Sequence, residues 1–214
     1  MIFRVKVCGI TQAEGLQEAV AAGADAVGFN FHPPSPRFVP PEVVSGLVKG
    51  LPRQVVTVGV FVNLGLDHVV EWMDRSGVTW AQFHGDQQPS DLAGFPRPWY
   101  PVLRPPRDEG SRVEAWERAP CILVDAREPE RYGGTGRTAN WKTAARLARQ
   151  RPVILAGGLH SGNLEAALEA VHPAAVDLNS GVESAPGIKD PVKLRQAMRI
   201  LAPWRKRFEE EVRT

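Results

Sequence analysis

The chain has 214 residues, a formal net charge of +2, 43% hydrophobic residues and 23% charged residues. A chain of this length and composition can bury a core without disulfides, and its small net charge gives no reason to expect a nucleic-acid or membrane partner. Its two cysteines cannot form a disulfide framework, and the N-terminus MIFRVKV resembles neither a signal peptide nor a transit peptide. We therefore expect a cytoplasmic protein in a reducing compartment.

Short apolar runs alternate with segments of helical spacing along the whole chain. Continuous Val- and Ile-rich runs are typical of parallel strands that helices cover. The expected strands are residues 3–8, 26–31, 55–62, 79–85, 99–104, 121–126, 152–158 and 174–181. The expected helices are residues 12–23, 40–51, 66–77, 88–95, 109–119, 141–151, 161–172 and 190–201.

Eight strand–helix units in just over 200 residues predict an α/β fold, a single (β/α)8 TIM barrel, with one domain over residues 1–214. The alternative is a doubly wound open sheet. Thr11 and Glu14 have the spacing of a capping box at the start of the first helix. The connection after the sixth strand, residues 127–140, is longer than most such loops, which indicates a functional segment.

Polar residues follow every expected strand. In a barrel, the carboxyl ends of the strands share one face, and active sites lie on that face. So many polar groups at strand ends indicate a bound ligand rather than a stabilised core. They are Cys8, Asn30, His32, Asn63, His84, Arg104, Asp125, the pair Gly157 and Gly158, and residues 177–181.

Cys8 and Asp125 are the candidate catalytic pair. A thiol near a helix N-terminus or a cation can act as a base, and a carboxyl with a raised pKa can act as a general acid. Because they follow the first and sixth strands, the two groups can meet across a small molecule. The alternatives are a merely buried thiol at Cys8 and a loop-capping carboxylate at Asp125. Cys121 opens the sixth strand and is assigned to the core.

Glycines and one arginine supply candidate anion sites. The glycine clusters after the seventh and eighth strands can present backbone N–H groups to a phosphate, and GGTG at 133–136 can close over the same group. Arg37, on the proline-rich segment PPSPR, can hold a planar carboxylate through two parallel hydrogen bonds. The residues alone thus indicate proton-transfer chemistry on a small phosphorylated substrate, without an organic cofactor.

Six motifs, in this order, resemble those of the phosphoribosylanthranilate isomerase family of tryptophan biosynthesis. They are KVCGIT at 6–11, SPR at 35–37, QFHGD at 82–86, VDA with GGTG at 124–136, AGGL with DLNSGVE at 156–183, and PGIKD at 186–190. The resemblance implies a (β/α)8 barrel that needs no cofactor or metal. It also implies the Amadori rearrangement of N-(5-phosphoribosyl)anthranilate to 1-(2-carboxyphenylamino)-1-deoxyribulose 5-phosphate.

The resemblance also implies a role for each matching residue. Asp125 would protonate the furanose ring oxygen, Cys8 would remove the C2 proton, and Arg37 would hold the anthranilate carboxylate. The remaining substrate-binding residues would be Gly157, Gly158, Ser180 and Gly181 at the phosphate, with His84 and Asp177 in support. Ala139, Asn140 and Asn179 depart from the family pattern.

Other readings of the same residues stay open at this point. A phosphosugar epimerase or the lyase that forms indole-glycerol phosphate is one, although the lyase would need lysines at strand ends, where Lys6 lies too deep. A metal-dependent hydrolase using His32, His84 and Asp125 is another, and no HxH or HExxH pattern supports it. A binding barrel without catalysis and a related aminoaldose isomerase complete the set. The expected partner is a small phosphorylated substrate, and the expected state is a monomer or a homodimer.

Overall fold

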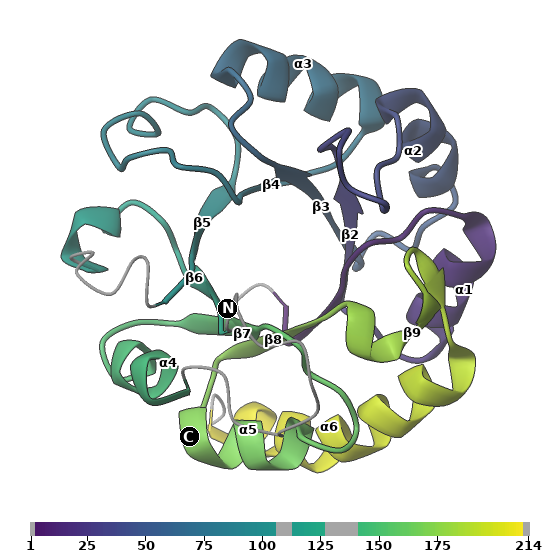
Figure 1. Cartoon of the computed structure of the whole chain (residues 1–214), viewed down its shortest axis with the longest axis vertical. Coiled ribbons are helices and arrows are strands. Elements are labelled where there is room, and N and C mark those ends of the chain that lie inside the picture. Colours follow the sequence, from purple (N-terminus) through teal and green to yellow (C-terminus); the bar gives the residue numbers. More distant parts are fainter. Residues whose placement is uncertain (1–2, 106–112, 127–140, 212–214) are drawn as a thin grey trace.

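The computed structural model describes residues 3–105, 113–126 and 141–211. Eight parallel strands form a closed barrel in chain order, and the last strand pairs with the first. Figure 1 looks along this barrel and shows the strands as a central ring with the helices outside it. The predicted (β/α)8 barrel is confirmed, and the open doubly wound sheet is wrong. The strands are β1 (Val5–Val7), β2 (Ala26–Asn30), β3 (Val56–Phe61), β4 (Trp80–Phe83), β5 (Trp99–Leu103), β6 (Ile122–Asp125), β7 (Val153–Ala156) and β8 (Ala175–Leu178).

Six α-helices lie within the described ranges, together with two short 3-10 helices and a small hairpin. The last helix continues to Glu211, ten residues beyond the end expected from the sequence. The helices are α1 (Ala13–Ala21), α2 (Pro41–Val48), α3 (Leu66–Ser76), α4 (Trp141–Ala148), α5 (Leu164–Val171) and α6 (Pro191–Glu211). The short elements are η1 (Val113–Trp116), η2 (Ser180–Val182), β9 (Glu183–Ala185) and β10 (Ile188–Lys189).

Two expected helices differ from the structure. Residues 89–94 form successive turns instead of a helix, and the Asp91 carboxylate accepts a hydrogen bond from the Gln88 backbone N–H at 2.7 Å. Phe95 of this segment still covers the sheet, in edge-to-face contact with Phe83 at 5.1 Å. Of the expected helix at 109–119, the described part contains only η1.

The expected capping box at Thr11 is wrong. Helix α1 has Gln12 at its N-cap, without a side-chain capping bond. The Thr11 hydroxyl instead donates to the carbonyl oxygen of Gly187 at 2.8 Å. Thr11 therefore ties the loop after β1 to the β9–β10 hairpin, beside the carboxyl ends of the strands.

Strand alternation decides which side chains reach the barrel interior. Successive residues of a strand point to opposite faces, so every second residue points inward. One hydrophobic cluster fills the space between the barrel and the helices, and a second fills the barrel interior, with Leu123 and Ala175 among its members. Two residues further along these strands stand Asp125 and Asp177. The interior is thus apolar below and polar at its carboxyl end.

The predicted core position of Cys121 can be compared with this interior. Cys121 belongs to the interior cluster and is 1% exposed, which confirms its assignment to the core. No helix in the described ranges is long and apolar enough to cross a membrane. The expectation that residues 1–214 form one domain stays a prediction.

Candidate active site

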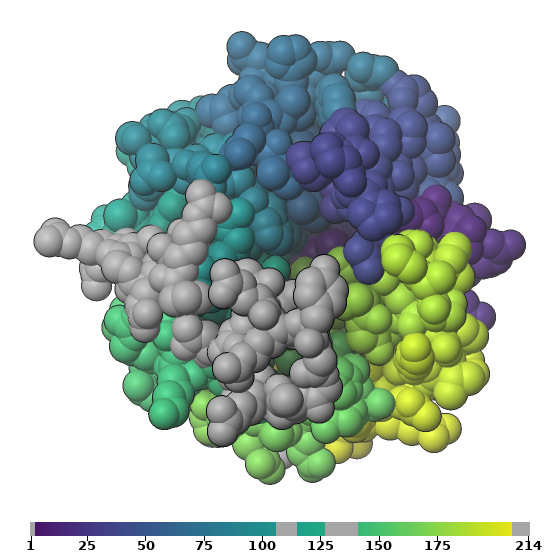
Figure 2. All heavy atoms as spheres, in the orientation of Figure 1, coloured from purple at the N-terminus to yellow at the C-terminus, as the bar shows by residue number. Residues whose placement is uncertain are grey.

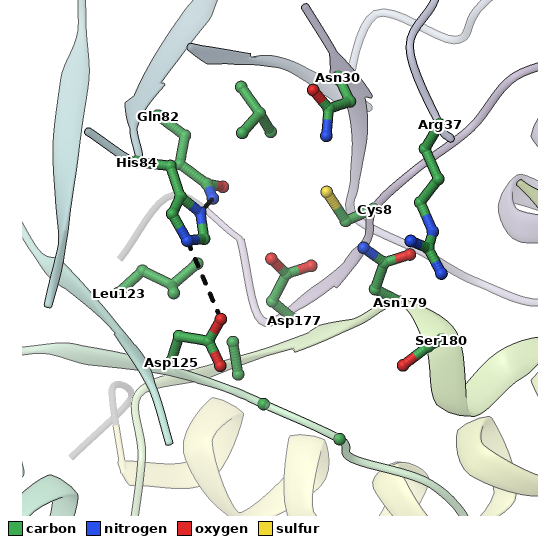
Figure 3. A pocket seen from close by; sticks show the side chains of 14 residues that line it. Cys8, Asn30, Arg37, Gln82, His84, Leu123, Asp125, Asp177, Asn179 and Ser180 are labelled. Atoms are coloured by element: carbon green, nitrogen blue, oxygen red, sulfur yellow. Dashed lines mark hydrogen bonds and ion pairs between the residues drawn. The ribbon is translucent and has the colours of Figure 1, made fainter. Parts of the chain in front are cut away.

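A cavity opens at the carboxyl ends of the strands. It encloses about 670 Å³, counting the part open to solvent, which suits a small-molecule ligand. Figure 3 shows polar side chains around its wall. The residues that line it are Cys8, Asn30, Arg37, Val60, Gln82, His84, Leu123, Asp125, Ala156, Gly157, Gly158, Asp177, Asn179 and Ser180.

Eight of the nine predicted site residues line this cavity. Cys8 and Asp125 reach it from different walls, with Asp177 between them, because β7 and β8 separate their strands in the barrel (Figure 3). Gly181 lies next to Ser180 but outside the lining. A side chain at Gly181 would overlap the Leu159 carbonyl, so this glycine lets the loops after β7 and β8 pack together. The GGTG segment lies outside the described residues.

The Cys8 thiol lies in a crowded, charged environment. It is 6% exposed, and burial is the main cause that raises the pKa of the thiol. Lys6 opposes this effect by its charge and by a hydrogen bond, whereas the Asp177 carboxylate adds to it. The sequence led us to expect a lowered pKa from a helix N-terminus. The structure instead shows Lys6, two residues before Cys8, as the main group that lowers this pKa, and burial outweighs its effect.

Lys6 and Asp177 form a buried ion pair below the cavity. Their Nζ and Oδ2 atoms are 2.7 Å apart. The charges of Asp177 and Cys8 outweigh the effect of burial and raise the pKa of Lys6, so its ammonium stays charged. Asp177 Oδ1 is buried and has no hydrogen-bond partner among the described residues.

A polar chain leads from the barrel interior to Asp125. The Tyr100 hydroxyl donates to Gln82 Oε1 at 3.0 Å, so the Gln82 amide nitrogen faces His84 Nδ1 at 3.5 Å. Burial lowers the pKa of His84, and the ring is therefore neutral near pH 7. Since an amide N–H only donates, Nδ1 accepts and the ring proton lies on Nε2. That nitrogen is 4.0 Å from Asp125 Oδ2 (Figure 3).

Arg37 is fixed by an acidic partner that the sequence analysis did not name. Its Nε donates to Glu183 Oε1 at 3.0 Å, and its terminal nitrogen donates to Oε2 at 2.5 Å. Lys189 Nζ donates to Glu183 Oε1 at 2.7 Å. Glu183 thus pairs with two cations, Arg37 and Lys189. Its single negative charge leaves the group with a net charge of one positive, which can attract an anion in the cavity. Figure 2 shows the two segments in contact, the dark blue loop after β2 and the yellow-green segment around β9.

The loop that carries Arg37 is shaped by Asn30 and Ser35. The Asn30 amide donates to the Ser35 hydroxyl oxygen at 3.0 Å, and the Arg37 backbone N–H donates to the same oxygen at 3.2 Å. A side chain at Gly9 would lie 2.7 Å from Arg37 Cδ and from Asn179 Oδ1. The glycine after Cys8 therefore leaves room for the arginine beside the thiol.

The glycines after β7 leave the cavity wall bare. Gly157 and Gly158 have φ values of 99° and 66°, in the left-handed region that favours glycine. A Cβ on Gly158 would meet nothing within 4 Å. Without side chains, these two residues leave their backbone N–H groups open to a ligand in the cavity.

Sequence reasoning missed several residues that shape the site. Asn30 and Asn179 stand at strand ends and were not selected as site residues, and Gln82 was quoted only within a motif. Two of them stand two positions from a selected residue: Gln82 on β4 precedes His84, and Asn179 follows Asp177. Of the hydrolase ligands His32, His84 and Asp125, only the last two line the cavity. Among the described residues, no three His, Cys, Asp or Glu side chains are grouped to hold a metal ion.

Comparison with known families decides which site this is. Residues 5–199 match the family model described as N-(5'-phosphoribosyl)anthranilate (PRA) isomerase. The chain belongs to this family. The resemblance seen in the motifs is thereby confirmed, and the chain is an isomerase of the PRA isomerase family.

Individual PRA isomerases agree in sequence and in fold. The chain is 47% identical over 198 residues to the N-(5'-phosphoribosyl)anthranilate isomerase of Geobacter metallireducens, covering 92% of this chain and 98% of the relative. The crystal structure of the Thermotoga maritima enzyme superposes with a TM-score of 0.84 at 33% identity, covering 92% and 98% of the two chains. A PRA isomerase solved in complex with reduced 1-(o-carboxyphenylamino)-1-deoxyribulose 5-phosphate has a TM-score of 0.76 at 31% identity, covering 92% and 97%.

Proposed function

We propose that the chain converts N-(5'-phosphoribosyl)anthranilate to 1-(2-carboxyphenylamino)-1-deoxyribulose 5-phosphate in tryptophan biosynthesis, with Asp125 as the general acid and Cys8 as the general base. The observation that carries this proposal is that the thiol and the carboxyl line one cavity from different walls. A base and an acid on different sides of one substrate are what two successive proton transfers need.

Asp125 acts first, on the furanose ring. The anthranilate nitrogen donates its lone pair to C1 of the sugar, and the bond from C1 to the ring oxygen breaks. Asp125 gives its proton to that oxygen, which becomes a hydroxyl, and a protonated imine remains at C1. The neutral His84 ring lies beside the carboxyl, with Nε2 at 4.0 Å from Asp125 Oδ2.

Cys8 acts second, on C2. The positive imine acidifies the C2 proton, so a thiolate is a sufficient base. The Cys8 sulfur takes this proton, the C1–C2 double bond of an enolamine forms, and the imine nitrogen recovers its electron pair. Protonation at C1, with loss of the proton of the C2 hydroxyl, then gives the ketone. Both proton transfers use one bound geometry, so positioning contributes a large part of the rate.

Three groups of residues hold the substrate in this proposal. Arg37 binds the anthranilate carboxylate with the donors that Glu183 does not occupy. Asp177, which lines the cavity, contacts the sugar. The phosphate is bound at the loops after β7 and β8 by Gly157, Gly158, Ser180 and Gly181.

The rival activities fit the described site less well. A lyase of the indole-glycerol phosphate type needs lysines facing the substrate, and Lys6 is fully buried against Asp177. The proposed steps use only side chains of this chain, so we expect turnover without a cofactor or metal. Two buried free cysteines suit the cytoplasm, which we propose as its location. The oligomeric state, monomer or homodimer, stays a prediction.

A fluorescence assay tests the proposed reaction. Added phosphoribosylanthranilate should lose its anthranilate fluorescence at a rate proportional to enzyme concentration. NMR should identify the product as the ketose, and mass spectrometry should show that its mass equals that of the substrate. An unchanged substrate, or a product of different mass, would overturn the proposal.

A further inference from the structure

Lys6 is a buried lysine to which the mechanism above gives no role. It is 0% exposed, on β1, and within the described ranges its ion-pair partner is Asp177. Burial of two charges costs several kcal/mol of desolvation, and a buried ion pair is therefore a weak source of stability. Stability alone is a poor reason for a lysine at this position.

The position of Lys6 relative to Cys8 suggests a reason. Residues two apart on a strand point to the same face, so Lys6 and Cys8 both point into the barrel, with Cys8 nearer the cavity. A Cβ on Gly28, on the neighbouring β2, would lie 2.8 Å from Cys8 Sγ and 3.0 Å from Lys6 Nζ. The Cys8 sulfur and the Lys6 ammonium therefore both lie against Gly28, on the side where another residue would carry its side chain.

We propose that Lys6 is a positioning residue that acts through Cys8: its buried ammonium, held on Asp177, stabilises the Cys8 thiolate and so sets how much of the enzyme holds an active base. The proposal rests on the proposed function, in which Cys8 is that base. When the thiolate takes the C2 proton it becomes a neutral thiol, and Lys6 keeps its proton and its bond to Asp177. The sulfur loses its negative charge in this step and the imine nitrogen loses its positive charge, so the net charge of the site does not change.

The two partners of this pair act on the thiol with opposite signs. Lys6 lowers the pKa of Cys8, and Asp177 raises it. The effect of Lys6 is the larger of the two, and burial opposes it. Within the part of the chain that the structure describes, Arg37 from the β2 loop, Lys189 from β10 and Tyr100 from β5 also interact with the thiol.

Because Lys6 and Asp177 shift the pKa of Cys8 in opposite directions, substituting each residue should give opposite results. The rate of Cys8 alkylation by iodoacetamide is measured against pH in the wild type, Lys6→Met and Asp177→Asn, with the Cys8 and Cys121 peptides separated by mass spectrometry. Lys6→Met should raise the midpoint and slow alkylation near neutral pH by at least about tenfold, because one pKa unit is a factor of ten in thiolate. Asp177→Asn should lower the midpoint and speed alkylation.

A merely structural role for Lys6 gives a different result. A loosened interior exposes the thiol and speeds alkylation in both variants, and it also speeds alkylation of Cys121, whose pKa burial raises to about 12. An unchanged or lowered midpoint in Lys6→Met overturns the proposal. If Lys6→Met does not fold, the double variant Lys6→Met/Asp177→Asn keeps the interior neutral, and its midpoint must still rise because the larger effect is lost.

Turnover separates this proposal from the proposed function. Lys6→Met should lower kcat at least about tenfold and leave KM within about twofold, because Lys6 lies below the cavity rather than in its lining. Near-normal turnover of Cys8→Ala would refute Cys8 as the base. The pH midpoints of alkylation test only the effect of Lys6 on the thiol. The turnover of Cys8→Ala tests only whether Cys8 is the base, so the two proposals can fail separately.

Discussion

Arg37 and Glu183 are joined by two parallel hydrogen bonds, at 3.0 Å from Nε and 2.5 Å from the terminal nitrogen. The carboxylate is nearly buried, and the hydrogen bonds from Arg37 and Lys189 outweigh burial and lower the pKa of Glu183. Glu183 is therefore ionised at neutral pH. It fixes the guanidinium plane beside the cavity, so Arg37 meets an incoming carboxylate with little loss of side-chain freedom.

We predict that Glu183→Gln weakens substrate binding. An amide cannot accept both bonds with the strength of a carboxylate, so Arg37 loses its fixed orientation. KM should rise by about three- to tenfold while kcat stays within about twofold. Steady-state kinetics measure both. The control is Glu169→Gln, an exposed glutamate on α5, which should leave KM unchanged. Equal KM values in all three proteins would argue against a positioning role.

Cys8→Ser should lower kcat by at least about 100-fold, because a hydroxyl is a far weaker base than a thiol. The fold should be retained, since sulfur and oxygen differ little in size. Cys121→Ala removes the other buried thiol and should keep kcat within about twofold, at a stability cost of about 1 kcal/mol. Circular dichroism and turnover of both variants check this. Full activity in Cys8→Ser would contradict the assignment.

Asp125→Asn should also lower kcat by at least about 100-fold, because an amide cannot give a proton to the ring oxygen. The change preserves shape, so substrate binding should persist and KM should change little. Asp67→Asn, at the exposed start of α3, is the matched control and should turn over normally. The role of Asp125 would be excluded by a variant that turns over at the wild-type rate.

The sequence was sufficient for the barrel and for most of the cavity lining. Eight apolar runs and their polar ends are local signals, and closure of the ring brings Cys8 and Asp125 to one face. The partners of these residues were harder to predict. Glu183 was quoted in a motif, but its bond to Arg37 joins residues 146 positions apart, which no local pattern specifies. Lys6 was judged too deep, although its register with Cys8 was readable from strand alternation.

Local signals also misplaced some elements. Thr11 has the residue type and spacing of an N-cap, but a tertiary bond to Gly187 uses its hydroxyl. Residues 88–95 have apolar spacing that fits a helix, but a helix of this length is only marginally stable and the segment forms turns. The departures at Ala139 and Asn140 lie outside the described residues. Asn179, the third departure, lines the cavity and accepts a bond from Lys189 at 3.3 Å.

Gly28→Ala should disturb the Cys8–Lys6 pair directly. The new methyl group would lie 2.8 Å from Cys8 Sγ and 2.9 Å from Lys6 Cε, closer than these atoms can approach. We expect a loss of about 1–3 kcal/mol of stability and a kcat at least about tenfold lower. Urea unfolding and turnover measure the two effects.

Gly46→Ala is the control for this substitution. Gly46 lies within α2, and a Cβ there meets nothing within 4 Å. It should gain about 0.5–1 kcal/mol of stability and keep its turnover, because alanine is the better helix former. If both glycine variants behaved alike, the crowding at Gly28 would have no functional meaning.

The stability of the fold should depend on His84 as the pH falls. Burial is the main cause that lowers the pKa of His84 below its ordinary 6.5, so the unfolded chain binds more protons than the folded one. The contribution of the neutral ring is complete above pH 6.5 and is lost as the pH falls below that value. His84→Gln should therefore lose less unfolding free energy than the wild type between about pH 7.5 and about pH 5.5. Identical losses in urea titrations would contradict this environment for His84.

The release of deuterium from phosphoribosylanthranilate labelled at C2 tests the central claim most directly, because it follows the single bond that Cys8 is assigned to break. Wild-type enzyme should release the label to solvent or transfer it to C1 as it forms the ketose, with a slower rate than for unlabelled substrate if this step limits turnover. Cys8→Ser should slow both label loss and ketose formation by at least about 100-fold. Label loss at the wild-type rate in Cys8→Ser would contradict the account.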